Sequence, residues 1–199
     1  MDEKEEFLET ASRLFIENGA KTLTMDEVAR EFSISKKTLY QMYKNKEALL
    51  EDVLNYQLQK VIEKMEMLDS KVENAVARMF CRDEEIAEAV RTNNSMLIRQ
   101  LVRYYPTIFY SHMKRFGNRF ATVLIRNIHK GREQGLYRTN FDEKTYAKLF
   151  LQLMMSYDAS PIFDQEERER TDFMEEVILM YMHSITTEKG KKELEKLNN

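Results

Sequence analysis

The chain of 199 residues contains one cysteine, two prolines, five glycines and no tryptophan. A single cysteine excludes an internal disulfide and any metal site built on two cysteines. With so little proline and glycine there are few helix breakers, and good helix formers such as leucine, methionine, glutamate and lysine fill long stretches. We therefore expect an all-α fold.

Long apolar runs are also missing. No stretch approaches the ~18 consecutive apolar residues of a membrane-spanning helix. The first fifteen residues, MDEKEEFLETASRLF, carry acids where a secretory signal has basic residues, and their apolar side chains are periodic. We expect a soluble, cytoplasmic protein with no membrane partner.

Positive charge is scarce overall, since the net charge is −3, but it is concentrated in one segment. Ser33 to Lys46 contains four lysines and no acid, whereas Asp2 to Glu9 contains five acids and one lysine. A local basic segment in an acidic protein is compatible with a small nucleic-acid-binding surface.

The pattern of the amino-terminal third predicts three short helices. The first ends at Asn18-Gly19 and has apolar residues at helical spacing, namely Phe7, Leu8, Ala11, Leu14 and Phe15. A capping box, Thr24 with Glu27, predicts the start of the second. Ser35 predicts the cap of the third, which would bury Leu39 and Tyr43. Two short helices about a tight turn form the layout of a helix-turn-helix unit, whose second helix enters the DNA major groove.

The remaining pattern predicts longer helices. Asn45 would cap a fourth helix running to about Met65, and Ser70 with Glu73 would form a capping box for the next. Asp83 or the cluster 93–95 would mark a further boundary. Later helices are expected from Pro106 to Glu133, after Asp142 as far as Ser160-Pro161, and around 173–185, whereas 189–199 is charged and should fray.

The segments LFIENG (14–19) and TMDEVAREFSISKKTLYQMYKNKEAL (24–49) closely resemble the amino-terminal signature of TetR-family transcriptional repressors. The resemblance is specific over about residues 7 to 54. Three places depart from it: Met42, where the family often has His or Tyr at the DNA backbone; Phe32-Ser33, where a small residue and Gly are common; and Lys37, often Gly.

The resemblance implies a role for each polar position of this segment. Residues that would hold phosphates are Thr24, Ser35, Lys36, Tyr40 and Lys46. Residues that would face base edges are Lys37, Thr38 and Gln41, with Gln41 suited to adenine, Lys37 to guanine and the Thr38 methyl to thymine.

The resemblance also implies an architecture of about nine helices: a DNA-binding domain at 1–47, followed by a helical ligand-binding and dimerisation domain at 48–199. One recognition helix contacts too few bases to select a genomic site, so a homodimer on a palindromic operator in double-stranded DNA is expected. The resemblance implies that the last two long helices form the dimer interface, and the segment 149–155, apolar on nearly all sides, supports an interface at residues 143–158 and 168–185.

A small-molecule effector, mainly apolar or aromatic, would release such a repressor from its operator. Methionine and aromatic side chains form adaptable apolar sites. The candidate lining residues of this type are Met96, Tyr104, Phe109, Met113, Phe116, Phe120, Met154 and Tyr157. Ordinary core packing is the alternative for each of them.

Two other functions compete with the regulator. An all-α metal enzyme would need ligands at close spacing, but His112, His129 and His183 are scattered and no His-Glu-x-x-His run exists. We therefore expect no enzyme, metal or cofactor. A protein-protein interaction adaptor would use the same amphipathic helices without reading DNA, and sequence-selective, salt-dependent DNA retention would separate the two.

Overall fold

The computed structural model describes residues 3–81, 94–160, 162 and 169–197. These residues form ten α-helices and no strand, which confirms the all-α expectation. They group into two compact units: residues 1–60 with 92–115, and residues 61–91 with 116–199. The helices α4 (Lys46–Lys71) and α8 (Pro106–Glu133) each continue from one unit into the other.

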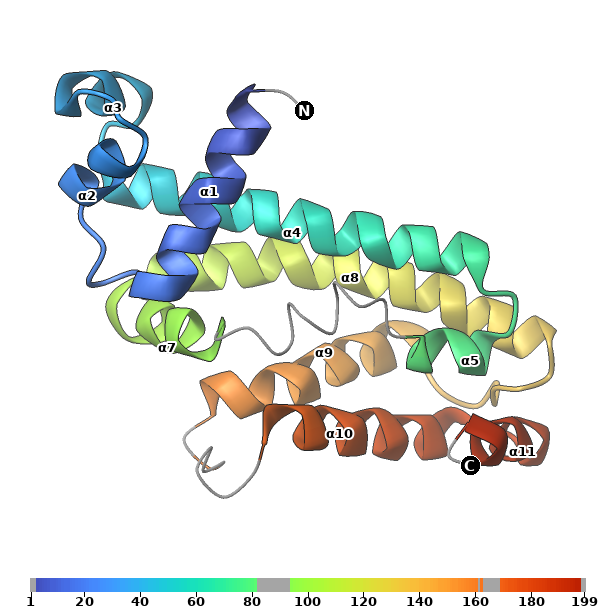
Figure 1. Ribbon diagram of the computed structural model, residues 1–199. Helices are drawn as coiled ribbons and strands as arrows, with labels where there is room; N and C mark the ends of the chain where they lie inside the picture. The colour runs from blue at the N-terminus through green and yellow to red at the C-terminus, as the bar shows by residue number, and fades with distance from the viewer. Residues whose placement is uncertain (1–2, 82–93, 161, 163–168, 198–199) are drawn as a thin grey trace. The chain divides into compact units, whose positions relative to one another are not determined.

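The first unit holds the short helices of the amino-terminal third (Figure 1). Besides the first halves of α4 and α8, its helices are α1 (Glu3–Asn18), α2 (Met25–Glu31), α3 (Lys36–Met42) and α7 (Asn94–Tyr104). Apolar side chains from every one of these helices are buried in its core, including Phe15, Val28, Leu39, Leu49 and Leu101.

The predicted start and stop signals of this unit are confirmed. Gly19 has φ 78° after the last residue of α1, a conformation that favours glycine. Thr24 and Glu27 form both hydrogen bonds of the capping box. The Ser35 side chain caps α3, and Asn45 Oδ1 accepts from the Ala48 amide at the start of α4.

The turn between α2 and α3 accounts for one departure from the TetR signature. Ser33 adopts φ 52°, in the left-handed region where glycine is easiest to accommodate. The Phe32 ring stacks on Phe7, with ring centroids 4.2 Å apart, and Phe7 also stacks on Tyr43 at 5.9 Å. The large residue at position 32 is therefore accommodated by an aromatic partner on α1.

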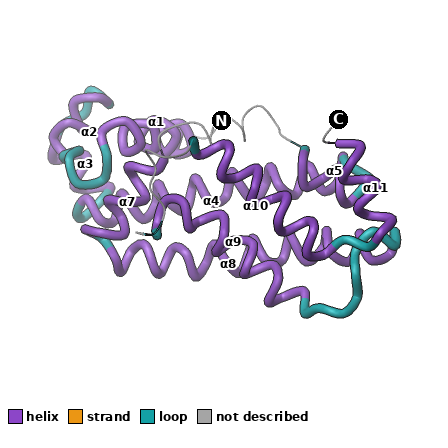
Figure 2. The backbone as a smooth tube through the Cα atoms, turned by 90° about the horizontal axis from the view of Figure 1, so that it is seen from below, coloured by secondary structure: helices purple, strands orange, loops and turns teal. Residues whose placement is uncertain are grey.

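The second unit contains the ends of α4 and α8 together with four further helices (Figure 2). These are α5 (Ala75–Phe80), α9 (Glu143–Ala159), α10 (Arg170–Ile185) and α11 (Glu188–Leu197). The ranges of α8, α9 and α10 agree with the predicted ones, and Asp142 caps α9 through the Thr145 amide. Helices α9 and α10 lie side by side, and the Phe150 and Tyr181 rings meet between them at 4.5 Å.

Two predictions for this unit are wrong. Ser70 does not begin a helix, because α4 continues to Lys71; the Ser70 hydroxyl donates to the Met67 carbonyl, and Asn74 caps α5 instead. The segment after Lys189 was expected to fray, but it is helical as far as Leu197. It forms α11, which buries Leu194 at 1% exposure, so tertiary contact stabilises a helix whose composition is mostly charged.

The boundary proposed near residues 83 or 93–95 is tested only in part. Helix α7 begins at Asn94, within the predicted cluster. Asp83 lies outside the described residues.

Candidate functional site

The exposed surface of α3 is mostly polar and surrounds a single buried anchor. Leu39 is fully buried and holds the helix in the core of the first unit. All other residues of α3 are exposed, including Tyr40 at 43% and Met42 at 52%. A seven-residue helix that buries one side chain leaves the rest of its surface for a partner.

Ser35 and Thr38 are tied together at the start of α3. The Thr38 amide donates to Ser35 Oγ at 3.0 Å, and the two hydroxyl groups are 2.7 Å apart. Both hydroxyls therefore have a local partner. The methyl group is the part of the exposed Thr38 side chain that this contact does not use.

Lys36 is already paired. Its ammonium lies 2.7 Å from Asp26 Oδ1 on α2, and this carboxylate raises the pKa of Lys36. The same ammonium stands 6.0 Å from the centre of the Tyr40 ring, one helical turn further along α3. A phosphate at Lys36 would have to share the lysine with Asp26.

Lys37 and Gln41 form a second pair of residues one turn apart. Both are exposed, and neither side chain has a hydrogen bond or ion pair with the described part of the chain. Residues at i and i+4 lie on one helix face. This face carries one cation and one amide, the groups that pair with guanine and adenine edges.

Thr24 is engaged in its capping box. Its hydroxyl accepts from the Glu27 amide at 3.2 Å and donates to Glu27 Oε2 at 2.8 Å. The Thr24 amide also donates to Glu27 Oε2, at 2.7 Å, and these two bonds to the carboxylate lower the pKa of Glu27. Thr24 is exposed, so it could contact a phosphate while it also caps α2.

Lys46, at the start of α4, is half-buried. Its ammonium donates to the Lys21 carbonyl at 3.0 Å, and burial lowers its pKa. The same loop is held from α7, because Gln100 Oε1 accepts from the Lys21 amide at 2.6 Å. The sequence analysis did not identify Lys21 or Gln100 as part of this unit's polar network, since they are 79 residues apart and no local pattern joins them.

The predicted ligand-lining residues are divided between the two units. Met96, Tyr104, Phe109 and Met113 belong to the first, and Phe116, Phe120, Met154 and Tyr157 to the second. Tyr104 is 41% exposed, with the Lys21 ammonium 4.3 Å from its ring centre. Phe116 and Phe120 have ring centroids 5.6 Å apart.

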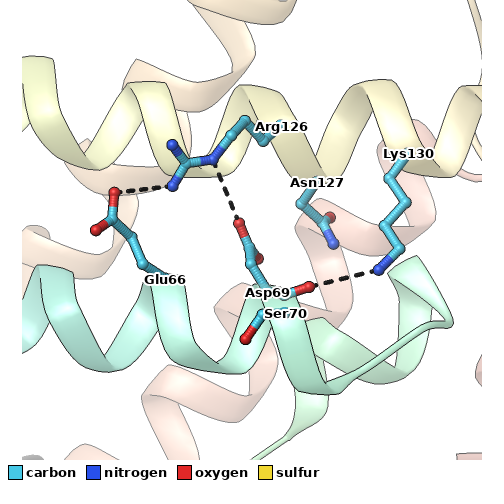
Figure 3. A pocket seen from close by; sticks show the side chains of 6 residues that line it. All are labelled: Glu66, Asp69, Ser70, Arg126, Asn127 and Lys130. Carbon is cyan, nitrogen blue, oxygen red and sulfur yellow. Dashed lines mark hydrogen bonds and ion pairs between the residues drawn. The ribbon is translucent and has the colours of Figure 1, made fainter.

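The second unit contains two adjoining pockets. The outer one, of about 280 Å³, lies between α4 and α8 and is polar (Figure 3). It is lined by Glu66, Asp69, Ser70, Arg126, Asn127 and Lys130. The inner one, of about 80 Å³, is mostly apolar and shares Asp69 and Asn127 with the outer pocket. Phe120 is the only predicted residue that lines either of these two pockets.

Arg78 and Asp69 form the ion pair at the junction of the two pockets. Arg78 Nε donates to Asp69 Oδ1 at 2.9 Å, and Nη2 donates to the Met65 carbonyl at 2.8 Å. This pair was not predicted from the sequence. A lone arginine in the otherwise apolar helix AVARMF was the available signal, because a buried cation needs a partner.

The histidines stand apart from one another. His112 is half-buried, and burial lowers its pKa to about 4, whereas His129 and His183 are exposed. The described residues contain no group of three or more side chains that could hold a metal ion. No described helix is long and apolar enough to cross a membrane.

Comparison with known proteins relates the amino-terminal third to one family. Residues 7–53 match the family model described as "Bacterial regulatory proteins, tetR family". The chain is 38% identical over 72 residues to the uncharacterized HTH-type transcriptional regulator YuxN of Bacillus subtilis, and 36% identical over 64 residues to YhgD of the same organism. These matches cover 36% and 32% of the chain, but only 25% of YuxN and 34% of YhgD.

Solved structures share the fold over nearly the whole chain. Reduced NemR of E. coli aligns with a TM-score of 0.71 at 18% identity, over 94% of this chain and 98% of NemR. A transcriptional regulator from Cytophaga hutchinsonii gives a TM-score of 0.71 at 18% identity, over 94% and 100%. FadR of Bacillus subtilis, solved with stearoyl-CoA, gives 0.60 at 14% identity, over 90% and 98%.

Proposed function

Because residues 7–53 match the tetR family model, we propose that the chain is a sequence-specific DNA-binding transcriptional regulator of this family and not an enzyme. We propose further that it acts as a repressor on a palindromic operator and is released by a mainly apolar or aromatic ligand. The chain spans only about a quarter to a third of the curated relatives that it matches, so this activity rests on the geometry of α3 as well as on the family.

The observation that carries the proposal is the pairing of side chains along α3. Lys36 and Tyr40 form one pair at i and i+4, and Lys37 and Gln41 form the next. The first pair is suited to phosphates and the second to base edges. Thr38 would add a methyl contact to thymine, because its hydroxyl is bonded to Ser35.

The phosphate-holding positions surround this helix. Ser35 and Lys36 lie at its start. Thr24 directly precedes α2, and Lys46 follows α3 at the start of α4. Contacts to phosphate would fix the orientation of α3 without selecting a sequence.

Selection of bound duplexes from a random pool tests the proposal. We expect a twofold-symmetric consensus, and Gln41→Ala should relax the preference at one position in each half-site while leaving the others unchanged. Lys37→Ala should relax a different position. Lys71→Ala removes one exposed lysine from the second unit and serves as the matched control. Recovery of no enriched sequence would favour the interaction adaptor instead.

The proposed dimer uses residues 143–158 and 168–185. Leu149 on α9 is 50% exposed and Met180 on α10 is 54% exposed, whereas Leu153, Met154 and Met155 are half-buried. Apolar side chains exposed together on two neighbouring helices favour burial against a second copy. In a symmetric dimer the same face of each copy would supply both sides of the contact.

Light scattering at micromolar concentration tests the dimer. The wild-type chain should have twice the monomer mass, and Leu149→Glu combined with Met180→Glu should yield monomers with unchanged helix content. Lys192→Glu, at an exposed residue of α11 outside the proposed interface, controls for added negative charge. A monomeric wild type would rule out this interface.

A further inference from the structure

Asp69 stands at the junction of the two pockets of the second unit. Its side chain is 17% exposed and comes from α4, and both pockets include it in their lining. Oδ1 is held by Arg78 at 2.9 Å. Oδ2 is buried and has no hydrogen-bond donor among the described residues.

The neighbouring groups do not satisfy Oδ2. Arg126 Nε is 3.7 Å away, beyond hydrogen-bond distance, and its guanidinium donates instead to Glu66 at 3.0 Å (Figure 3). Asn127 makes no hydrogen bond to Oδ2: its amide donates to the Ala75 carbonyl at 3.0 Å, and its oxygen accepts from the Tyr137 hydroxyl at 3.1 Å. A buried carboxylate oxygen without a donor is unfavourable, and a donor that reached it would be bound strongly.

The charges around the junction are nearly balanced. Arg78 and Arg126 face the carboxylates of Asp69 and Glu66, and Lys130 donates to the Val72 carbonyl at 2.8 Å. A cationic ligand would meet two guanidinium groups and the Lys130 ammonium, and an anionic ligand would meet two carboxylates. An uncharged ligand that carries a donor avoids both repulsions.

The inner pocket supplies an apolar environment for the rest of such a ligand. Its walls include Met65, Met79, Phe120 and Phe150. At about 80 Å³ it is smaller than the ~150 Å³ cavity that holds benzene, so an aromatic ring would also extend toward the outer pocket or displace a methionine. Methionine side chains adapt readily to such a change.

We infer that the junction binds a small uncharged molecule whose O–H or N–H group donates to Asp69 Oδ2 while its apolar body lies against Met65 and Met79. This inference deepens the ligand response in the proposed function and rests on it for its biological meaning. The ligand class that fits is an uncharged phenol, alcohol or amide, rather than an organic cation or a carboxylate.

The test uses phenol as the donor and its methyl ether, anisole, as the matched compound without one. Titration of the full chain, labelled with ¹³C at methionine methyl groups, should shift Met65 and Met79, assigned through Met65→Leu and Met79→Leu. Phenol should bind about tenfold more tightly than anisole, as expected for one hydrogen bond to a charged group. Benzylamine and benzoate should bind more weakly than phenol.

Asp69→Asn supplies the second arm, since its amide can turn an N–H toward the ligand in place of the acceptor. Phenol should lose its advantage over anisole in this variant, whereas Glu66→Gln in the outer pocket should retain it. If Asp69→Asn does not fold, the phenol–anisole comparison in the wild type decides alone. Equal binding of phenol and anisole, or shifts confined to other methionines, would overturn the inference.

These titrations contain no DNA, so they separate the inference from the proposed function. Phenol binding at Met65 and Met79 without any effect on operator binding would support the pocket and contradict the ligand response. If an operator is enriched but phenol binds no more tightly than anisole, the inferred ligand site is contradicted and the proposed function is not.

Discussion

The ammonium of Lys36 lies 2.7 Å from Asp26 Oδ1, so the first residue of α3 is joined to the first turn of α2. Both side chains are more than half exposed, which keeps the contribution of the pair to folding small. Its larger consequence concerns DNA, because Asp26 competes with a phosphate for the lysine.

Asp26→Asn should therefore strengthen binding to all duplexes alike. Releasing Lys36 and removing a nearby negative charge increases the number of phosphates neutralised, so the slope of log K against log salt should steepen by up to about 1. Fluorescence anisotropy at several salt concentrations measures both effects. Glu133→Gln makes the same charge change in the second unit and should alter neither. Weaker binding by Asp26→Asn would show that the pair orients α3 rather than competing with DNA.

Leu39 should dominate the stability of α3. Leu39→Ala removes a fully buried side chain and should lower the free energy of unfolding by about 2–5 kcal/mol, measured by urea denaturation. Met42→Ala, at a position 52% exposed on the same helix, should change it by no more than about 0.5 kcal/mol. Similar losses at the two positions would contradict the assignment of a single anchor.

Thr24→Ala should destabilise the first unit by about 1 kcal/mol through loss of the α2 cap. Thr24→Ser keeps the hydroxyl and should retain most of the stability. The difference from wild type should depend on pH. Thr24 lowers the pKa of Glu27 in the folded state, so the stabilisation is present above the ordinary value of 4.5 and is lost as pH falls through the lower folded-state value.

Denaturant midpoints of wild type and Thr24→Ala, measured at neutral pH and at about pH 3, test this dependence. The gap should narrow in acid. A gap that stays the same in acid would mean that the Glu27 carboxylate does not take part in the cap.

Gly190 should be essential for docking α11. A Cβ at this position would collide with the Leu136 carbonyl oxygen, a backbone atom that cannot rotate away. Gly190→Ala should lower the free energy of unfolding by about 1–3 kcal/mol and increase amide exchange in residues 188–197. Lys192→Ala, exposed on the same helix, is the control. Unchanged exchange would indicate that α11 docks without a close approach at Gly190.

The local signals in the sequence predicted local structure well. The caps at Thr24, Ser35, Asn45 and Asp142 depend on hydrogen bonds between residues three apart, and a sequence shows such spacing directly. The apolar periodicity predicted the long helices for the same reason. The sequence by itself therefore determined α1 to α4 and the signature carried by α2 and α3.

Tertiary structure decided which polar groups meet. Lys36 and Asp26 are ten residues apart, the Lys21 amide and Gln100 are 79 apart, and neither separation has a periodic signal. Helix α11 was misread because its charged composition favours fraying, whereas burial of Leu194 and the close approach at Gly190 stabilise it. The junction at Asp69 likewise required α4, α5 and α8 to be brought together, since a buried carboxylate is recognised only by what surrounds it.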